Sequence, residues 1–199
     1  MPDVVKEKRI LVTGKNGQLG QSILALTHKD SLNQFTFIDQ EDLDLSNDRS
    51  IADYFTDNTF DIIIHCAAYT AVDKAESEQA LADRVNHLAV KQLAEIAKKQ
   101  SAALIHISTD YVFNGQNFKP YVESDKVNPQ SVYGLTKLQG EQAFKKVNPK
   151  GMIIRTSWVY SEYGHNFVKT MLNLGDARDS LNVIFDQVGT PTYAGDLAK

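Results

Sequence analysis

The sequence predicts an α/β fold built on a doubly wound parallel sheet. Short apolar runs of strand length alternate along the chain with longer segments in which apolar residues recur at helical spacing. The stretch Asp61–Cys66 holds an unbroken run of three isoleucines, which is typical of a strand buried on both faces of a parallel sheet. Strands and helices that alternate with short connections favour one parallel sheet with helices on both faces.

The individual elements follow from the same patterns. Apolar and β-branched runs predict strands at Arg9–Thr13, Gln34–Asp39, Asp61–Cys66, Ala102–Ser108 and Gly151–Arg155. Helical spacing predicts helices at Gln18–His28, Ser50–Thr59, Gln79–Lys99 and Ser131–Lys146. The second helix has Ser46 or Asn47 near its cap, and the last follows the breaker Pro129. We expect a loop at Asp186–Thr192 and the first turn of another helix at Gly195–Lys199.

The bulk composition is that of a globular domain without a strong charge preference. The 199 residues are 42% hydrophobic and 23% charged, which suits one domain with a full core. The net charge of −4 gives no sign of a nucleic-acid or anionic membrane surface, and no apolar stretch approaches the ~20 residues of a membrane span. With Cys66 as its only cysteine, the chain can form no intrachain disulfide, and the cytoplasm is the predicted location.

Three glycines, Gly14, Gly17 and Gly20, lie between the first strand and the first helix. A glycine turn between a strand and a helix is typical of dinucleotide binding, although glycines in an ordinary βα turn can also serve packing alone. Glycine allows a tight turn and a close approach of the backbone to a pyrophosphate, and the helix start offers unpaired N–H groups. The spacing, G-x-x-G-x-x-G, differs from the G-x-G-x-x-G of many dehydrogenases. A Rossmann-type cofactor domain is therefore expected.

Acidic residues at and after the end of the second strand are placed to bind the adenosine part of a dinucleotide. Asp39 lies about 20 positions after the last glycine of the loop, where a carboxylate accepts from the ribose hydroxyls of NAD. Lys15, inside the glycine loop, could offset this negative charge, so NADH and NADPH both stay open as cofactors. Asp44 could accept from the adenine amino group, and Leu45 could pack on the ring.

A tyrosine and a lysine four residues apart form a second group. On a helix, Tyr133 and Lys137 project from one face. A free phenol has a pKa of about 10, and a nearby ammonium would bring that pKa toward the working range. Such a pair is suited to donate a proton to a carbonyl oxygen while a hydride is transferred to the carbonyl carbon. Lys137 can also bind the hydroxyls of the nicotinamide ribose. Thr109, at a strand end, could hydrogen-bond the same oxygen, with Ser108 as the weaker alternative.

Further candidates lie at other strand ends. The small residues of the stretch 67–70 would let a cofactor lie across the end of the third strand, and Trp158 and Asn166 flank a loop that could form a substrate wall. Cys66 is expected to be an inert core thiol. No metal site is predicted, because the histidines show no metal-ligand spacing: His28, His65, His87, His106 and His165.

These motifs resemble those of the extended short-chain dehydrogenase/reductase family, and within it the branch that reduces dTDP-4-dehydro-L-rhamnose. Besides the glycine loop and Tyr133 to Lys137, the resemblance is carried by Ala67–Glu76, Ser108–Phe113, Arg155–Tyr160, Asn166–Met171 and Asp186–Thr192. It implies Thr109, Tyr133 and Lys137 as catalytic residues. It implies cofactor contacts from Gly14, Gly17, Gln18, Leu19, Gly20, Asp39, Asp44, Leu45, Ala68, Tyr69, Thr70, Tyr133 and Lys137, and substrate contacts from Thr109, Trp158 and Asn166.

The resemblance also implies a reaction, which is hydride transfer from NADPH or NADH to the C4 ketone of dTDP-4-dehydro-L-rhamnose. The product, dTDP-L-rhamnose, feeds surface polysaccharide. The implied partners are the nucleotide-sugar substrate and, as one option, a second copy in a homodimer. Tyr111 follows Asp110 where related dehydratases have glutamate, which argues against elimination chemistry. Two alternatives stay open: a non-catalytic NADP-binding regulatory subunit similar to that of methionine adenosyltransferase, and another nucleotide-sugar reductase or epimerase.

Members of that branch continue well beyond the length of this chain. The resemblance therefore implies a truncated chain. It would consist of a cofactor domain with, from about residue 151 to 199, only the beginning of a smaller substrate-binding lobe. Such a chain is expected to bind cofactor with little or no turnover.

Overall fold

A computed structural model describes residues 6–199, and the first five residues of the expected 1–199 domain lie outside it. Its main sheet has the strand order β2-β1-β3-β4-β5, with every pairing parallel. The strands are β1 (Arg9–Thr13), β2 (Gln34–Ile38), β3 (Ile62–His65), β4 (Ala103–Thr109) and β5 (Lys150–Thr156). The predicted doubly wound parallel sheet is confirmed. Because the strand order reverses between β1 and β3, the crevice at their carboxyl ends is where such sheets bind ligands.

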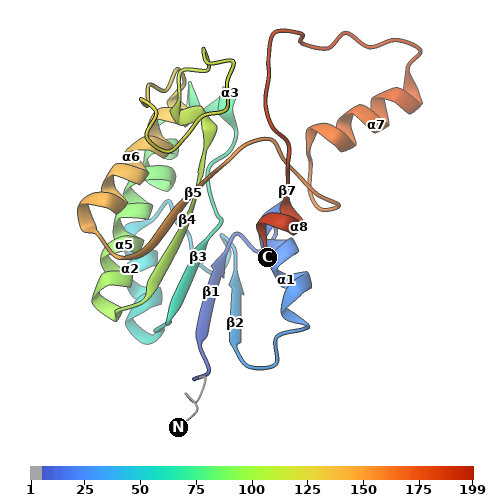
Figure 1. The fold of residues 1–199 in the computed structure, drawn as a ribbon. Coiled ribbons are helices and arrows are strands. Elements are labelled where there is room, and N and C mark those ends of the chain that lie inside the picture. Colours follow the sequence, from blue (N-terminus) through green and yellow to red (C-terminus); the bar gives the residue numbers. More distant parts are fainter. Residues whose placement is uncertain (1–5) are drawn as a thin grey trace.

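Helices pack on both faces of this sheet (Figure 1). One face carries α1 (Gln18–Thr27) and the short α8 (Ala194–Leu197), and the other carries α2 (Asp48–Asp57), α5 (Ala89–Gln100) and α6 (Val132–Val147). Side chains alternate between the two faces along each strand. Leu11 and Ile63 are fully buried in the α2–α5–α6 core. Val12 faces α1 in a smaller core, which explains why the strands read as unbroken apolar runs.

The long helix expected at Gln79–Lys99 is present but not uniform. It consists of α4 (Gln79–Asp83), a π-helical turn at Arg84–Leu88, and α5. The cap of α2 is Asn47, whose side chain accepts from the backbone N–H groups of Arg49 and Ser50. The expected start of a helix near the end of the chain is confirmed by α8.

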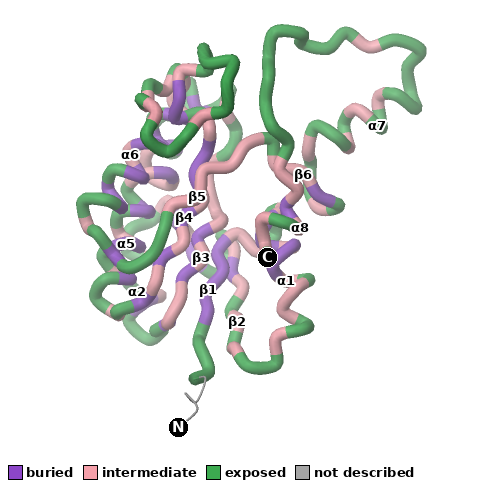
Figure 2. Tube along the Cα trace, in the orientation of Figure 1, coloured by how far each residue is buried: buried purple, intermediate pink, exposed green. Residues whose placement is uncertain are grey.

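Several elements were not predicted from the sequence. They are α3 (Val72–Ala75), a 3-10 turn (Asp110–Val112), β6 (Val159–Tyr160), α7 (Phe167–Ala177) and β7 (Thr192–Tyr193). Strands β6 and β7 form a second, two-stranded parallel sheet, so the expected loop ends in a strand at Thr192. Helix α7 and the segment after it project away from the main sheet, and none of the residues in α7 is buried (Figure 2). Among residues 6–199, no helix has the length and apolar character to cross a membrane.

Candidate active site

The glycine loop approaches the end of β3 closely. Gly14 has a φ of +75°, and a Cβ there would lie 2.9 Å from the backbone nitrogen of Ala67. A Cβ on Gly20 would lie 2.2 Å from the carbonyl oxygen of Gly14. Gly17 caps α1 without a side-chain hydrogen bond, and no acidic residue occupies the first turn. The positive end of α1 is therefore open to an anion.

A cleft of about 630 Å³ begins at this loop and follows the carboxyl ends of the central strands. It brings together predicted residues from five separate parts of the chain: the loop, the end of β2, the end of β3, the β4–α6 region and the segment after β5. The predicted residues that line it are Gly14, Gly17, Gln18, Leu19, Gly20, Asp39, Ala68, Thr70, Thr109, Tyr133, Lys137 and Trp158.

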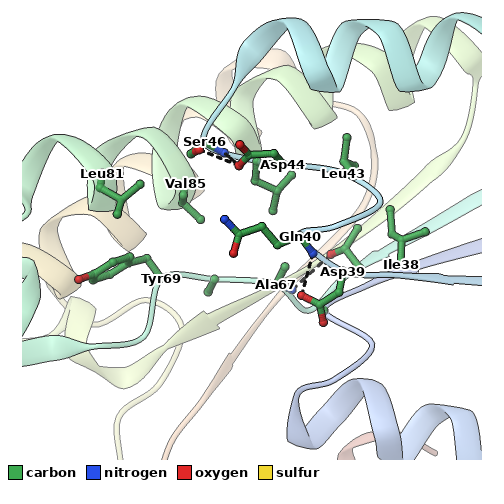
Figure 3. A pocket seen from close by; sticks show the side chains of 14 residues that line it. Ile38, Asp39, Gln40, Leu43, Asp44, Ser46, Ala67, Tyr69, Leu81 and Val85 are labelled. Carbon is green, nitrogen blue, oxygen red and sulfur yellow. Dashed lines mark hydrogen bonds between the residues drawn. The ribbon is translucent and has the colours of Figure 1, made fainter.

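A second cavity, of about 270 Å³, adjoins the cleft beside β2 (Figure 3). Of the predicted residues, Asp44, Leu45 and Tyr69 line this cavity alone, while Gly14, Asp39 and Ala68 line both spaces. Apolar side chains from α4 and the π-helical turn, Leu81 and Val85, form the opposite wall in Figure 3. Its apolar walls and few polar groups suit a flat heterocycle.

Helix α6 positions Tyr133 and Lys137 on the cleft. The helix is capped by Ser131, whose hydroxyl accepts from the backbone N–H of Gly134 at 3.1 Å. The Lys137 side chain is only 2% exposed, and its Nζ donates to the carbonyl of Ile107 at 2.7 Å. Thr109 is buried at the end of β4, two residues after Ile107.

Burial decides the protonation of these groups. It raises the pKa of the Tyr133 phenol to about 12, against the opposing effect of a hydrogen bond with Thr109. It lowers the pKa of the Lys137 ammonium to about 8, against the opposing charge of Glu141. The expected lowering of the Tyr133 pKa by Lys137 is therefore not seen, because desolvation of the phenolate dominates. At neutral pH the tyrosine carries its proton and can act as a donor.

A family model described as the RmlD substrate binding domain matches residues 8–199. The chain belongs to this family. It is similar to dTDP-4-dehydrorhamnose reductases from Aggregatibacter actinomycetemcomitans, 46% identical over 96% of this chain, and Sinorhizobium fredii, 48% identical over 96%. The chain spans 65% and 64% of the length of those two relatives.

Solved structures of dTDP-4-dehydrorhamnose reductases are also similar to this chain. A dTDP-4-dehydrorhamnose reductase from Clostridium acetobutylicum superposes with a TM-score of 0.91 at 47% identity, over 96% of this chain and 67% of that one. The Bacillus anthracis enzyme, described in complex with NADP, has a TM-score of 0.91 at 40% identity, over 96% of this chain and 68% of its own.

One predicted contact residue of this RmlD-family chain lies outside both cavities. Asn166 caps α7, where its Oδ1 accepts from the backbone N–H of Lys169 at 3.0 Å. Its Nδ2 donates to Oε1 of Gln18 at 3.0 Å. Gln18 in turn donates to the carbonyl of Val159 at 3.1 Å. Asn166 therefore ties the start of α1 to the segment after β5.

A buried ion pair beneath the cleft was missed from the sequence. Glu141 is fully buried on α6, and its two carboxylate oxygens accept from Nε and Nη2 of Arg155 at 2.8 and 2.6 Å. Oε1 also accepts from the hydroxyl of Ser108 at 2.6 Å. The pair joins α6, β4 and β5 directly behind Lys137. The sequence did hold a signal for Glu141, because a residue four positions after Lys137 lies on the same face of the helix.

Asn86 was also missed, and no sequence signal pointed to it. It lies in the π-helical turn with its side chain buried. Its Oδ1 accepts from the N–H of Tyr69 at 2.9 Å, and its Nδ2 donates to the carbonyl of the same residue at 3.0 Å. A further bond of 3.3 Å reaches Thr136 on α6. Asn86 thus fixes the loop after β3 against the helix that carries Tyr133.

The histidines of β3 and β4 are core residues. His65 and His106 stack with ring centroids 5.4 Å apart. Burial lowers the pKa of His65 to about 3 and also lowers that of His106, so both are neutral. His65 Nδ1 lies 2.8 Å from the hydroxyl of Thr13. Within the described part of the chain, no group of three or more His, Cys, Asp or Glu residues is placed to hold a metal ion. Burial also raises the pKa of the Cys66 thiol to about 12.

Proposed function

We propose that the protein is an NAD(P)H-dependent reductase that converts the C4 ketone of dTDP-4-dehydro-L-rhamnose to the alcohol of dTDP-L-rhamnose. One observation supports this most: Thr109, Tyr133 and Lys137 meet in a cleft that is continuous with the glycine loop. The assignment of the substrate rests on the names of the relatives, because no residue in the cleft is specific for thymine. The NADP in the Bacillus anthracis structure supports a nicotinamide cofactor.

The residues around the glycine loop fit such a cofactor. Side chains are excluded at Gly14 and Gly20 by the neighbouring backbone, so the loop keeps its close turn. The uncapped start of α1 would hold the pyrophosphate through its N–H groups. The smaller cavity would take the adenine between its apolar walls, with Asp44 and Leu45 at its edge. When bound, the nicotinamide supplies a hydride.

The chain's own residues would supply the proton and the positioning. Tyr133 is protonated at neutral pH and can deliver its proton to the oxygen of the reduced carbonyl. Thr109 would share that oxygen as a hydrogen-bond donor. The Lys137 ammonium, four residues further along α6, would offset part of the cost of the phenolate that remains after proton transfer, while burial still dominates the Tyr133 pKa.

The segment after β5 would form the substrate side of the site. Trp158 lines the cleft and has a φ of +47°, a conformation that non-glycine residues rarely adopt. We propose that it contacts the nucleotide sugar, as part of a smaller lobe within residues 151–199, and that Asn166 acts there by orienting Gln18. A homodimer and a cytoplasmic location remain predictions, which sedimentation and fractionation of the full-length protein would check.

The test follows nicotinamide absorbance with dTDP-4-dehydro-L-rhamnose, using the full-length protein, its Tyr133→Phe variant and a Tyr54→Phe control on α2. We expect turnover in the wild type and the control, and a loss of at least about a hundredfold in Tyr133→Phe, since general acid catalysis typically contributes ~10²–10⁴. Cofactor binding without turnover of this substrate would contradict the proposal. It would favour the regulatory subunit or, if another 4-keto sugar nucleotide were reduced, a related reductase.

A further inference from the structure

Gln18, the first residue of α1, connects the glycine loop to the segment that follows β5. After β5 the chain runs across the carboxyl edge of the sheet toward α1 and α8 (Figure 1). This segment, residues 158–166, begins with Trp158 and forms one wall of the cleft. The glycine loop and the start of α1 form another wall of the same cleft. The two walls are joined by the Gln18 side chain.

Three hydrogen bonds hold the amide group of Gln18. Its Nε2 donates to the carbonyl of Val159 at 3.1 Å. Its Oε1 accepts from Nδ2 of Asn166 at 3.0 Å and from the hydroxyl of Ser161 at 3.1 Å. Both lone pairs of this oxygen are therefore occupied. All three partners lie 141–148 positions further along the chain, in the segment 158–166.

The partners of Gln18 also hold one another. Nδ2 of Asn166 donates to the carbonyl of Ser161 at 2.9 Å. The hydroxyl oxygen of Ser161, a residue only 6% exposed, accepts from the backbone N–H of Tyr163 at 3.1 Å. The position of the Gln18 amide and the conformation of the segment therefore depend on each other.

The segment has few other polar links to the cofactor domain. Among the residues that the structure describes, no other side-chain hydrogen bond joins residues 158–177 to residues 6–149. The carbonyl of Trp158 accepts from the backbone N–H of Thr192 in β7 at 3.3 Å, and Glu162 accepts from the hydroxyl of Tyr193. Gln18 is therefore the polar link that positions this wall against the start of α1.

The backbone of Gln18 belongs to the cofactor side of the cleft. Gly17 caps α1, so the N–H of Gln18 is the first of the N–H groups that have no partner within the helix. Under the proposed function, these groups hold the pyrophosphate. One residue thus has its N–H at the cofactor and its side chain on the wall that carries Trp158.

We propose that Gln18 couples the binding of the cofactor to the binding of the nucleotide sugar, by positioning the segment 158–166. The inference rests on the proposed function. A pyrophosphate at the N–H of Gln18 fixes the start of α1, and the Gln18 amide then fixes the wall against which the nucleotide sugar packs. The second ligand has less of that wall to order, so it binds more tightly. Such coupling is reciprocal, and each ligand tightens the binding of the other by the same factor.

Fluorescence titration of the full-length protein with NADPH, with and without saturating dTDP-L-rhamnose, measures this factor. The two ligands do not react with each other, because one is the reduced cofactor and the other is already the alcohol. In the wild type we expect the nucleotide sugar to lower the Kd of NADPH at least about fivefold, the lower end of the usual range. Gln18→Met keeps the backbone N–H and a side chain of similar length but removes all three bonds, so the factor should fall to about one.

Ser161→Ala tests the same link from the other wall. Ser161 bonds Gln18 but lines neither cavity, so its replacement should reduce the factor and leave the Kd of NADPH alone unchanged. Thr27→Ala is the matched control, since it removes a hydroxyl that donates to the carbonyl of Leu24 at 2.8 Å in the last turn of α1. It should keep the wild-type factor. A merely structural role of Gln18 would weaken NADPH binding equally with and without the nucleotide sugar.

The outcomes separate the inference from the proposed function. A wild-type factor of about one would overturn the inference, and so would a factor that either Gln18→Met or Ser161→Ala leaves at its wild-type value. An equal loss in Thr27→Ala would also overturn it. Failure of the wild type to bind NADPH would contradict the proposed function itself, and the inference with it.

Discussion

Replacing Lys137 with methionine should stabilise the fold at neutral pH while it removes the proposed activity. Burial lowers the pKa of this ammonium from 10.5 to about 8. At about 1.4 kcal/mol per pKa unit, holding the charged form inside the protein costs about 3.5 kcal/mol. Methionine has a similar length but gives up the charged hydrogen bond from Nζ to the Ile107 carbonyl, which costs about 1.5–3 kcal/mol. The expected net gain in unfolding free energy is about 0.5–2 kcal/mol at pH 7.

The dependence on pH gives this prediction its sharpest test. Between about pH 8 and pH 10.4 the unfolded chain still binds the Lys137 proton while the folded chain has released it. Stability of the wild type therefore rises with pH across this window, and the advantage of Lys137→Met should disappear by about pH 10. Urea unfolding of both proteins across the window measures the difference.

Lys98→Met is the matched control for this experiment. Lys98 also donates from Nζ to a backbone carbonyl, that of Val147 at 2.7 Å, but its side chain is exposed. Its replacement should bring no gain at pH 7 and no dependence on pH in the same window. A Lys137→Met protein that is not stabilised at pH 7, or whose gain is constant with pH, would refute the idea that a charged lysine is buried at a cost.

Two further predictions concern stability. Glu141→Gln should cost about 3–5 kcal/mol in urea unfolding, because it leaves the Arg155 guanidinium without its carboxylate, and the double variant Glu141→Leu/Arg155→Met should recover most of that loss. Since the pKa of Glu141 is lowered in the fold, this advantage of the wild type should fade as pH falls below about 4.3; a constant difference would contradict it. Gly20→Ala should reduce the melting temperature and cofactor affinity, because its Cβ would meet the carbonyl of Gly14. Gly175→Ala, in open space on α7, should stabilise by about 0.5–1 kcal/mol, and similar effects at both glycines would argue against the clash.

The sequence by itself determined those features that depend on neighbours along the chain. The strand-length apolar runs predicted all five strands of the sheet, and the glycines between β1 and α1 predicted the tight turn that the structure shows there. Tyr133 and Lys137 share a face because they are four residues apart on a helix, which needs no tertiary information. The alternation of elements was enough to predict that their strand ends share one edge of the sheet.

Only the tertiary structure decided how these groups are charged and paired. The Tyr133 pKa rises because burial removes water from the phenol, and spacing to Lys137 gave the opposite expectation. Glu141 meets Arg155 from a different element, and Asn166 turns from the cleft to cap α7. Lys15 lies in the glycine loop, and only the fold brings Glu41 and Asp42 against its ammonium group. Desolvation and ion pairing depend on residues that are distant in sequence. The charges and partners of these groups are therefore decided only when the chain folds.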